Sequence, residues 1–243
     1  SERRPLGRVR PLAEEIVRQV KERAPVDLIE IAGSIRRWKE TVNDIDILTA
    51  SGEPGKVMDA FVKIPSVDRV LMQGPTRSSI ITTDGIQVDL RVVDRGAFGA
   101  ALQYFTGSKQ HNIKLREMAV RAGLKISEYG VFREPGERRI GGKKERDVYK
   151  ALHLPLVPPE LREDAGEIEA AQRGALPDLI TVEDIKGDLH LHTKWSDGSH
   201  DLDALIQAAR EKGYGYLAVT DHTRGLGIAH GLDEERLAEQ ARL

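Results

Sequence analysis

The spacing of apolar residues predicts alternating helices and strands in the first part of the chain. Leu12, Ile16 and Val20 recur every four positions, which is typical of an amphipathic helix that packs through one face. Farther along, two alternating segments flank Asp84-Gly85, a dipeptide favoured in hairpin turns. Up to residue 93 the pattern predicts helices over 11–23 and 55–64 and strands over 28–32, 44–48, 79–83 and 87–93.

After residue 96 the pattern becomes helical and then changes again. A hairpin is expected between 125–133 and 138–141, and the proline-rich segment 154–160 is expected to be extended, because a residue before proline avoids the helical region. Beyond residue 186 the rhythm is strand, helix, strand, which is typical of parallel α/β folds. The other expected elements are helices over 97–105, 110–122 and 202–212 and strands over 188–193 and 216–220.

Composition describes a globular chain with room for more than one domain. Of its 243 residues, 40% are hydrophobic and 31% are charged. No apolar run approaches the roughly 20 residues that span a bilayer, and no signal peptide is recognisable, so no membrane partner and a cytoplasmic location are expected. The absence of cysteine excludes disulfides and thiolate metal sites.

Charge is distributed unevenly along the chain. Residues 101–150 carry 12 Lys and Arg against 6 Asp and Glu, whereas residues 151–243 carry 9 against 18. Charge runs are most often solvated surface. If one part of the chain follows a phosphate backbone, the basic middle is the part that fits.

Two aspartates, Asp44 and Asp46, alternate on an expected strand shortly after a Gly-Ser turn. Side chains two positions apart leave the same face of a strand, so both carboxylates occupy one small volume. Like charges at that separation are costly unless a cation neutralises them, and hard oxygen ligands suit Mg²⁺ or Mn²⁺. The turn can present backbone N–H groups to an anion, and Arg36 and Arg37 add charged donors. This combination indicates phosphoryl or nucleotidyl transfer.

A second polar group lies at the ends of the two strands expected after residue 186. His190 and His192 leave one face of the first strand, and Asp197 follows in the next loop. Asp221-His222 comes at the end of the second strand. Because the carboxyl ends of parallel strands meet at one edge of the sheet, these side chains are expected to converge. Neutral imidazole with carboxylate suits Zn²⁺, Mn²⁺ or Fe.

The order of the first motifs resembles that of the family X DNA polymerases, which belong to the nucleotidyltransferase superfamily. The matching segments are GSIRR at 33–37, DID at 44–46, VDLR at 88–91, YFTGS at 104–108 and EYG at 128–130. The resemblance covers about residues 8–163. It implies that Asp44, Asp46 and Asp89 are catalytic and hold Mg²⁺ or Mn²⁺. Two such metals stabilise the attacking and leaving oxygens when a dNTP is joined to a primer 3′-hydroxyl.

The same resemblance implies a nucleotide site. Ser34 and Arg37 would grip the β and γ phosphates, and Tyr104 and Phe105 would lie against the sugar. Trp38 departs from the family pattern, since a glycine usually follows the arginine pair. The implied nucleotide-binding residues are Gly33, Ser34, Arg37, Tyr104, Phe105, Gly107, Lys109, Asn112 and Arg116.

Residues 187–243 resemble the first two motifs of the PHP (polymerase and histidinol phosphatase) domain. That domain is a barrel with a metal-dependent phosphoesterase site, and its later ligand motifs are absent from this chain. Asp221 is expected to orient its neighbour. His111 and His200 are expected to be surface or packing residues. The implied metal ligands are His190, His192, Asp197 and His222.

The expected fold is an α+β nucleotidyltransferase palm with a mixed or antiparallel sheet, a small α+β nucleotide-closing subdomain, and the first βα units of an α/β PHP barrel. The expected boundaries are 1–100 for the palm, 101–163 for the closing subdomain (thumb or fingers), 164–186 for a linker and 187–243 for a truncated PHP domain. The resemblance implies a fragment of a bacterial or archaeal polymerase, without a lyase-like and helix-hairpin-helix region and without most of the PHP domain.

The implied activity is filling of gaps in DNA during base excision repair. Its partners would be gapped or primer-template DNA and a dNTP, and the protein would act as a monomer near the nucleoid. The PHP portion of the parent protein would be a 3′-5′ exonuclease or a related phosphoesterase.

Two alternatives remain open. A nucleotidyltransferase acting on a small molecule or an RNA end shares the Gly-Ser turn and paired aspartates, but it needs neither YFTGS nor a base-sensing Asn112 and Arg116. Template dependence of incorporation separates it from a polymerase. A catalytically idle DNA-binding remnant is the other alternative. Three clustered carboxylates argue against it, because they repel one another unless an ion is bound.

Overall fold

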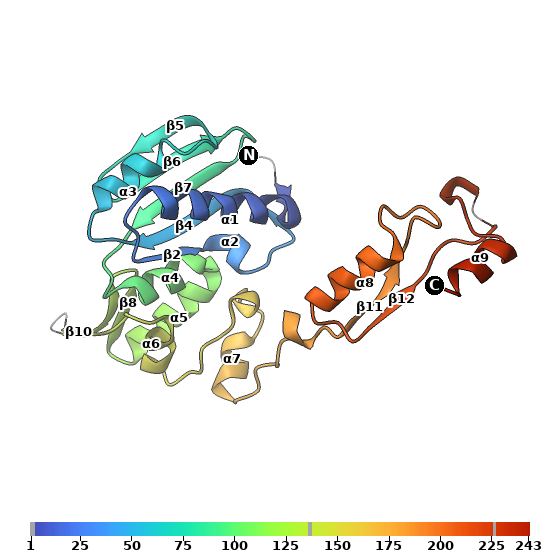
Figure 1. The fold of residues 1–243 in the computed structure, drawn as a ribbon. Helices are drawn as coiled ribbons and strands as arrows, with labels where there is room; N and C mark the ends of the chain where they lie inside the picture. Colours follow the sequence, from blue (N-terminus) through green and yellow to red (C-terminus); the bar gives the residue numbers. More distant parts are fainter. Residues whose placement is uncertain (1–2, 136–137, 226) are drawn as a thin grey trace. The chain divides into compact units, whose positions relative to one another are not determined.

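The computed structural model describes residues 3–135, 138–225 and 227–243, and the chain divides into two compact units (Figure 1). The first unit is Ser1–Leu176 and the second is Pro177–Leu243. Both units combine helices with strands, so the expected mixed α+β class is confirmed. Within the described ranges, no helix has the length and apolar character that crossing a membrane requires.

A mixed five-stranded sheet organises the first unit. Its strands are β2 (Leu28–Ile31), β4 (Asp44–Ala50), β5 (Val67–Gln73), β6 (Arg77–Thr82) and β7 (Gln87–Val92), in the order β2-β4-β7-β6-β5. β4 and β7 are parallel and the other neighbours are antiparallel. The hairpin expected about Asp84-Gly85 is confirmed as β6 and β7. A short pair, β1 (Arg4–Pro5) with β3 (Thr41–Val42), lies outside this sheet.

Two helices, α1 (Leu6–Arg23) and α3 (Pro54–Phe61), cover one face of the sheet (Figure 1). Their apolar residues share a core with Ile45 and Ile47 of β4. α1 begins five residues earlier than the sequence predicted, because Val9 extends the buried face of the helix by a turn. Pro11 therefore lies inside the helix. On the opposite face, Leu48 packs against α4 (Phe98–Thr106). The alternation of β4 thus turns its odd and even positions toward different helices.

The rest of the first unit has its own core. Its elements are α5 (Lys109–Arg121), β8 (Leu124–Ser127), β9 (Gly130–Arg133), β10 (Arg138–Gly141), α6 (Glu145–Ala151), the 3₁₀ turn Pro159–Leu161 and α7 (Glu167–Gln172). The hairpin expected between 125–133 and 138–141 is confirmed by the antiparallel pairing of β9 with β10, but 125–133 is not one strand, because it divides into β8 and β9. The chain reverses at Glu128-Tyr129, and Gly130 follows as the first residue of β9 with a φ of +137°. Ile168 of α7 belongs to the core of this part, so the residues up to 176 lie within the first unit.

The second unit carries the strand, helix, strand pattern that the sequence predicted. β11 (Gly187–Leu191) and β12 (Tyr216–Val219) are parallel and are joined through α8 (Leu202–Glu211). Its other elements are the 3₁₀ turns Val182–Asp184 and Gly227–Ala229 and the helix α9 (Glu234–Gln240). Parallel strands with this connection bring the residues that follow β11 and β12 to one edge.

Candidate nucleotide and metal sites

The register of β4 and β7 brings three carboxylates onto one face of the sheet. Asp46 is the cross-strand partner of Asp89, and Asp44 precedes Asp46 by two positions. The intervening Ile45 is fully buried in the core on the other face. Burial, followed by the charges of Asp44 and Asp89, raises the pKa of Asp46 to about 6. The carboxylates therefore repel one another in a partly dry site, which is the electrostatic condition that a divalent cation relieves.

Asp89 is oriented by groups that the sequence analysis did not identify. Ser79 donates a short hydrogen bond to Oδ1 of Asp89, and Nε2 of Gln87 donates to Oδ2 at 3.0 Å. Nη2 of Arg77 lies 3.6 Å from Oδ1. Asp89 is itself only 8% exposed. Sequence reasoning could not have found Ser79, because a two-residue turn at Asp84-Gly85 would pair Asp89 with Ile80, whereas the observed register pairs it with Ser79.

A pocket of about 340 Å³ adjoins the carboxylates. Asp44 and Asp46 line one side, and Asp89 lies on the neighbouring strand without lining the pocket. All nine residues that the resemblance assigned to nucleotide binding line this one pocket. The complete lining is Gly33, Ser34, Arg37, Asp44, Asp46, Tyr104, Phe105, Thr106, Gly107, Lys109, Asn112 and Arg116. Carboxylates thus meet three cationic side chains in a space suited to a metal-bound polyanion.

Gly33 begins the four-residue helix α2 (Gly33–Arg36) and approaches Asp46 closely. Its φ is +61°, and a Cβ built on it would overlap Oδ2 of Asp46. Only glycine leaves room for that carboxylate oxygen while adopting this backbone conformation. The donor set of the carboxylate face consists of oxygen atoms, and together with this close cradle it fits Mg²⁺ or Mn²⁺.

Replacing Gly33 by alanine is expected to weaken the binding of a Mg²⁺-nucleotide by about tenfold, because the new methyl displaces Asp46 and the backbone is strained. Titration calorimetry with Mg²⁺-dGTP measures the change. Gly52→Ala is the matched control, since a Cβ there meets nothing within 4 Å. Equal affinity of the two variants would contradict this role for Gly33.

The two arginines after the Gly-Ser turn have different environments. Arg37 lines the pocket, with Nε donating to Glu163 at 2.8 Å and Nη1 donating to the carbonyl oxygen of Thr106 at 2.5 Å. Arg36 is not among the lining residues; it donates two hydrogen bonds to Glu145, at 2.7 and 2.8 Å, and one to the hydroxyl of Thr106 at 2.8 Å. Of the two charged donors expected near the turn, Arg37 thus lines the pocket, whereas Arg36 pairs with Glu145 beside it. Its charge is satisfied by an acid more than a hundred residues away in sequence.

Asn112 and Trp38 are both held by specific contacts. Asn112 accepts a hydrogen bond from Gln103 at 2.7 Å and donates one to the carbonyl oxygen of Tyr104 at 2.8 Å, which ties α5 to α4. Trp38 has a φ of +56°, a conformation that favours glycine, and the Arg10 guanidinium lies 4.1 Å from its ring centroid. Glycine, which the resemblance implied at this position, would adopt this backbone conformation without strain.

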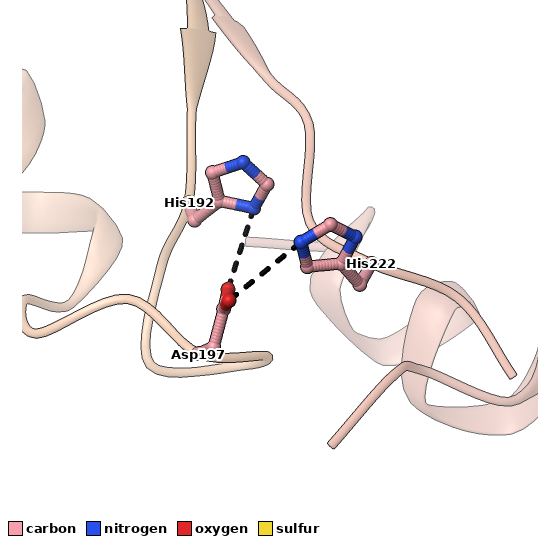
Figure 2. A group of neighbouring side chains, drawn as sticks. All are labelled: His192, Asp197 and His222. Carbon is pink, nitrogen blue, oxygen red and sulfur yellow. Dashed lines mark ion pairs between the residues drawn. The ribbon is translucent and has the colours of Figure 1, made fainter. Parts of the chain in front are cut away.

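The second unit brings three predicted ligands together (Figure 2). One ligand atom from each of His192, Asp197 and His222 lies within 4.8 Å of the others. Asp197 is 3.5 Å from Nδ1 of His192 and 3.6 Å from Nε2 of His222. Nδ1 of His192 is buried and has no hydrogen-bond partner within the described ranges, as expected of an atom that meets a metal. His190 adjoins the group, with its Nε2 3.1 Å from Nε2 of His192.

Asp221 holds the loop that carries Asp197. It accepts hydrogen bonds from the backbone N–H and hydroxyl of Thr193, at 2.7 and 2.5 Å, and from Ser196 at 2.5 Å. Gln240 of α9 also donates to it. Burial alone would raise the pKa of Asp221, but these hydrogen bonds outweigh it and hold the pKa below its usual value. In the described part of the chain, the hydrogen-bond partners of the Asp221 side chain are Thr193, Ser196 and Gln240, so Asp221 fixes the loop of Asp197 rather than its neighbour His222.

Fold and sites together define an α+β protein with a pocket lined by carboxylate and cationic side chains in one unit and a histidine-aspartate group suited to a metal ion in the other. Residues 101–163 match the family model "DNA polymerase beta thumb", and residues 188–236 match the PHP domain. The chain is similar to the family X DNA polymerases that carry a PHP domain.

Two curated relatives illustrate the match. The chain is 40% identical over 244 residues to the "DNA polymerase/3'-5' exonuclease PolX" of Bacillus subtilis (strain 168), an alignment that covers 99% of this chain and 42% of that protein. It is 28% identical over 161 residues to the "DNA polymerase lambda" of Rattus norvegicus, which covers 54% of this chain and 28% of that protein. The chain thus spans less than half the length of either relative.

Proposed function

We propose that the protein to which this chain belongs is a DNA-directed DNA polymerase that fills gaps during base excision repair. Residues 1–100 act as its palm and residues 101–163 as its nucleotide-closing thumb subdomain. The observation that carries the proposal is the single pocket in which Asp44 and Asp46 meet all the residues assigned to nucleotide binding. Gapped or primer-template DNA and a dNTP are its substrates, and it acts as a monomer in the cytoplasm.

The side chains of the pocket divide the work of nucleotidyl transfer. Asp44, Asp46 and Asp89 would hold Mg²⁺ or Mn²⁺, which supplies charge stabilisation at the attacking and leaving oxygens. Ser34 and Arg37 bind the outer phosphates of the nucleotide.

The opposite wall of the pocket holds the rest of the nucleotide. Tyr104 and Phe105 lie against the sugar of the nucleotide. Lys109, Asn112 and Arg116 of α5 line the wall next to the base. A fixed wall of this kind raises the rate by holding the reacting groups in line.

Residues 187–243 form the first part of a PHP domain. In the whole protein, this domain acts as a 3′-5′ exonuclease or a related phosphoesterase. The converging His192, Asp197 and His222 support this assignment, and His190 adjoins them. Their nitrogen and oxygen atoms would hold Zn²⁺, Mn²⁺ or Fe.

Primer extension on a one-nucleotide gap tests the polymerase assignment. The 243-residue chain, supplied with Mn²⁺ and each dNTP in turn, should add the nucleotide complementary to the template base. Addition without regard to the template would favour a nucleotidyltransferase that acts on RNA ends or small molecules. Binding of DNA without turnover would favour an idle DNA-binding remnant.

Replacing His192 by alanine is expected to weaken the binding of Mn²⁺ to the second unit by at least about tenfold, because one converging ligand is removed. Manganese electron paramagnetic resonance titration of the 243-residue chain, with Asp44 and Asp46 both changed to asparagine to silence the first site, measures this. His200→Ala is the control, since His200 is exposed and outside the group. Equal losses of Mn²⁺ affinity in the His192→Ala and His200→Ala variants would exclude a metal site at His192.

A further inference from the structure

Helix α5 presents two functional faces. Lys109, Asn112 and Arg116 recur at helical spacing and line the nucleotide pocket. His111 lies on another face and is fully buried. A helix that carries three pocket residues must be held in position, because small displacements of a binding wall are costly to affinity and rate. What fixes the far side of α5 therefore matters to the pocket.

His111 connects α5 to α7 and α6 through both ring nitrogens. Nδ1 lies 2.6 Å from Oε1 of Glu167, and Nε2 lies 3.0 Å from the hydroxyl of Tyr149. The pKa of Tyr149 is raised above its usual value, mainly by burial, so its hydroxyl keeps the proton and donates to Nε2. Nδ1 then carries the imidazole proton and donates to Glu167. One neutral tautomer satisfies all three groups.

Glu167 also fixes its own end of the connection. Its carboxylate accepts the backbone N–H groups of Asp164 at 3.0 Å and of Ala165 at 2.8 Å, where the chain turns into α7. Lys114 of α5 pairs with Asp164 at 3.1 Å and with Glu169 at 2.5 Å. The segment 164–169 thus touches α5 at two positions one turn apart. It lies beyond the residues that match the thumb model.

We propose that Glu167, acting through His111, is a positioning residue that fixes α5 and thereby the nucleotide-binding side chains on its opposite face. The proposal rests on the proposed nucleotide site, and it extends the functional polymerase unit past residue 163 to include α7. The residues after the thumb are then part of the polymerase rather than a passive connection. Glu167 touches no reacting atom, so its effect should reach the nucleotide only through α5.

Titration of the 243-residue chain with Mg²⁺-dGTP tests the proposal. Glu167→Ala should weaken binding by about tenfold, because an unpaired His111 N–H no longer anchors α5. Glu167→Gln should retain most of the affinity, since its amide oxygen still accepts from His111. His111→Phe keeps the ring volume but removes both hydrogen bonds, so it should weaken Mg²⁺-dGTP binding as Glu167→Ala does. It also tests the proposal if Glu167→Ala folds poorly. Hydrogen exchange should accelerate across α5 in both weakened variants.

Val57→Ala, a core truncation in α3 far from α5, serves as the control for a general loss of stability. It separates such a loss from the specific effect of Glu167 on α5. At a matched drop in melting temperature, this control should bind Mg²⁺-dGTP within about twofold of the wild type. The proposal is overturned if folded Glu167→Ala and His111→Phe bind like the wild type, or if Val57→Ala weakens binding equally. If the wild-type chain binds no Mg²⁺-dGTP, the proposed nucleotide site itself fails instead.

Discussion

Replacing Asp89 by alanine is expected to slow nucleotide addition by about a thousandfold or more. Asp89 faces the same side of the sheet as Asp44 and Asp46, so its removal takes away one of the three proposed metal ligands where charge would develop in the reaction. Metal stabilisation of such charge contributes several kcal/mol, which corresponds to roughly three or more factors of ten in rate. Single-turnover extension of a gapped primer at saturating dNTP and Mg²⁺ measures the chemical step directly.

Two comparisons make the Asp89 result specific. Asp68→Ala removes an exposed aspartate from β5 of the same sheet and should extend the primer like the wild type. Ser79→Ala should give an intermediate loss of rate, because Asp89 then keeps its charge but loses one orienting hydrogen bond. An Asp89→Ala protein that still extended the primer at the normal rate would remove the basis of the polymerase assignment.

Local patterns predicted the elements that depend on neighbouring residues. The alternation of β4 and the Asp84-Gly85 turn correctly predicted the hairpin and the shared face of the carboxylates, because a strand period and a turn dipeptide are encoded within a few positions. β5 was missed, since it is an edge strand whose residues are nearly all exposed and lack a buried alternating face. The residue pattern missed the β8–β9 hairpin, because the chain reverses at Glu128-Tyr129, which is not a favoured turn dipeptide.

The residues that line the pocket were predictable from the sequence, whereas the residues that hold them in place were not. The residues that line it lie in compact motifs, so a resemblance could assign them one by one. The partners of those residues come from distant segments: Glu163 binds Arg37 and Glu167 binds His111. No period or spacing relates such positions, and only the folded chain brings them together. The expectation that His111 was a surface or packing residue missed this role.

Replacing Glu145 by alanine is expected to destabilise the first unit by about 3–5 kcal/mol, the typical cost of removing one partner from a buried charge pair. Glu145 accepts hydrogen bonds from Arg36, at 2.7 and 2.8 Å, and from Arg162 at 2.6 Å. Arg162 is fully buried and packs over the ring of Tyr149. Without the carboxylate, two guanidinium groups would remain close together with no shared counter-charge. Urea unfolding at pH 7 measures the loss, and Glu117→Ala on the exposed face of α5 is the control.

The same carboxylate should make stability depend on pH in a defined direction. Burial would raise the pKa of Glu145, but the hydrogen bond from Arg36 and the charge of Arg162 outweigh it and hold the pKa below its usual value. Its stabilising contribution is therefore complete above the unfolded pKa of about 4.3 and is lost as the pH falls through the folded pKa. Wild-type stability should decline below about pH 4.3 more steeply than that of Glu145→Gln, which has no proton to bind at this position. Parallel acid profiles for the two proteins would mean that Glu145 is not the charged centre of this cluster.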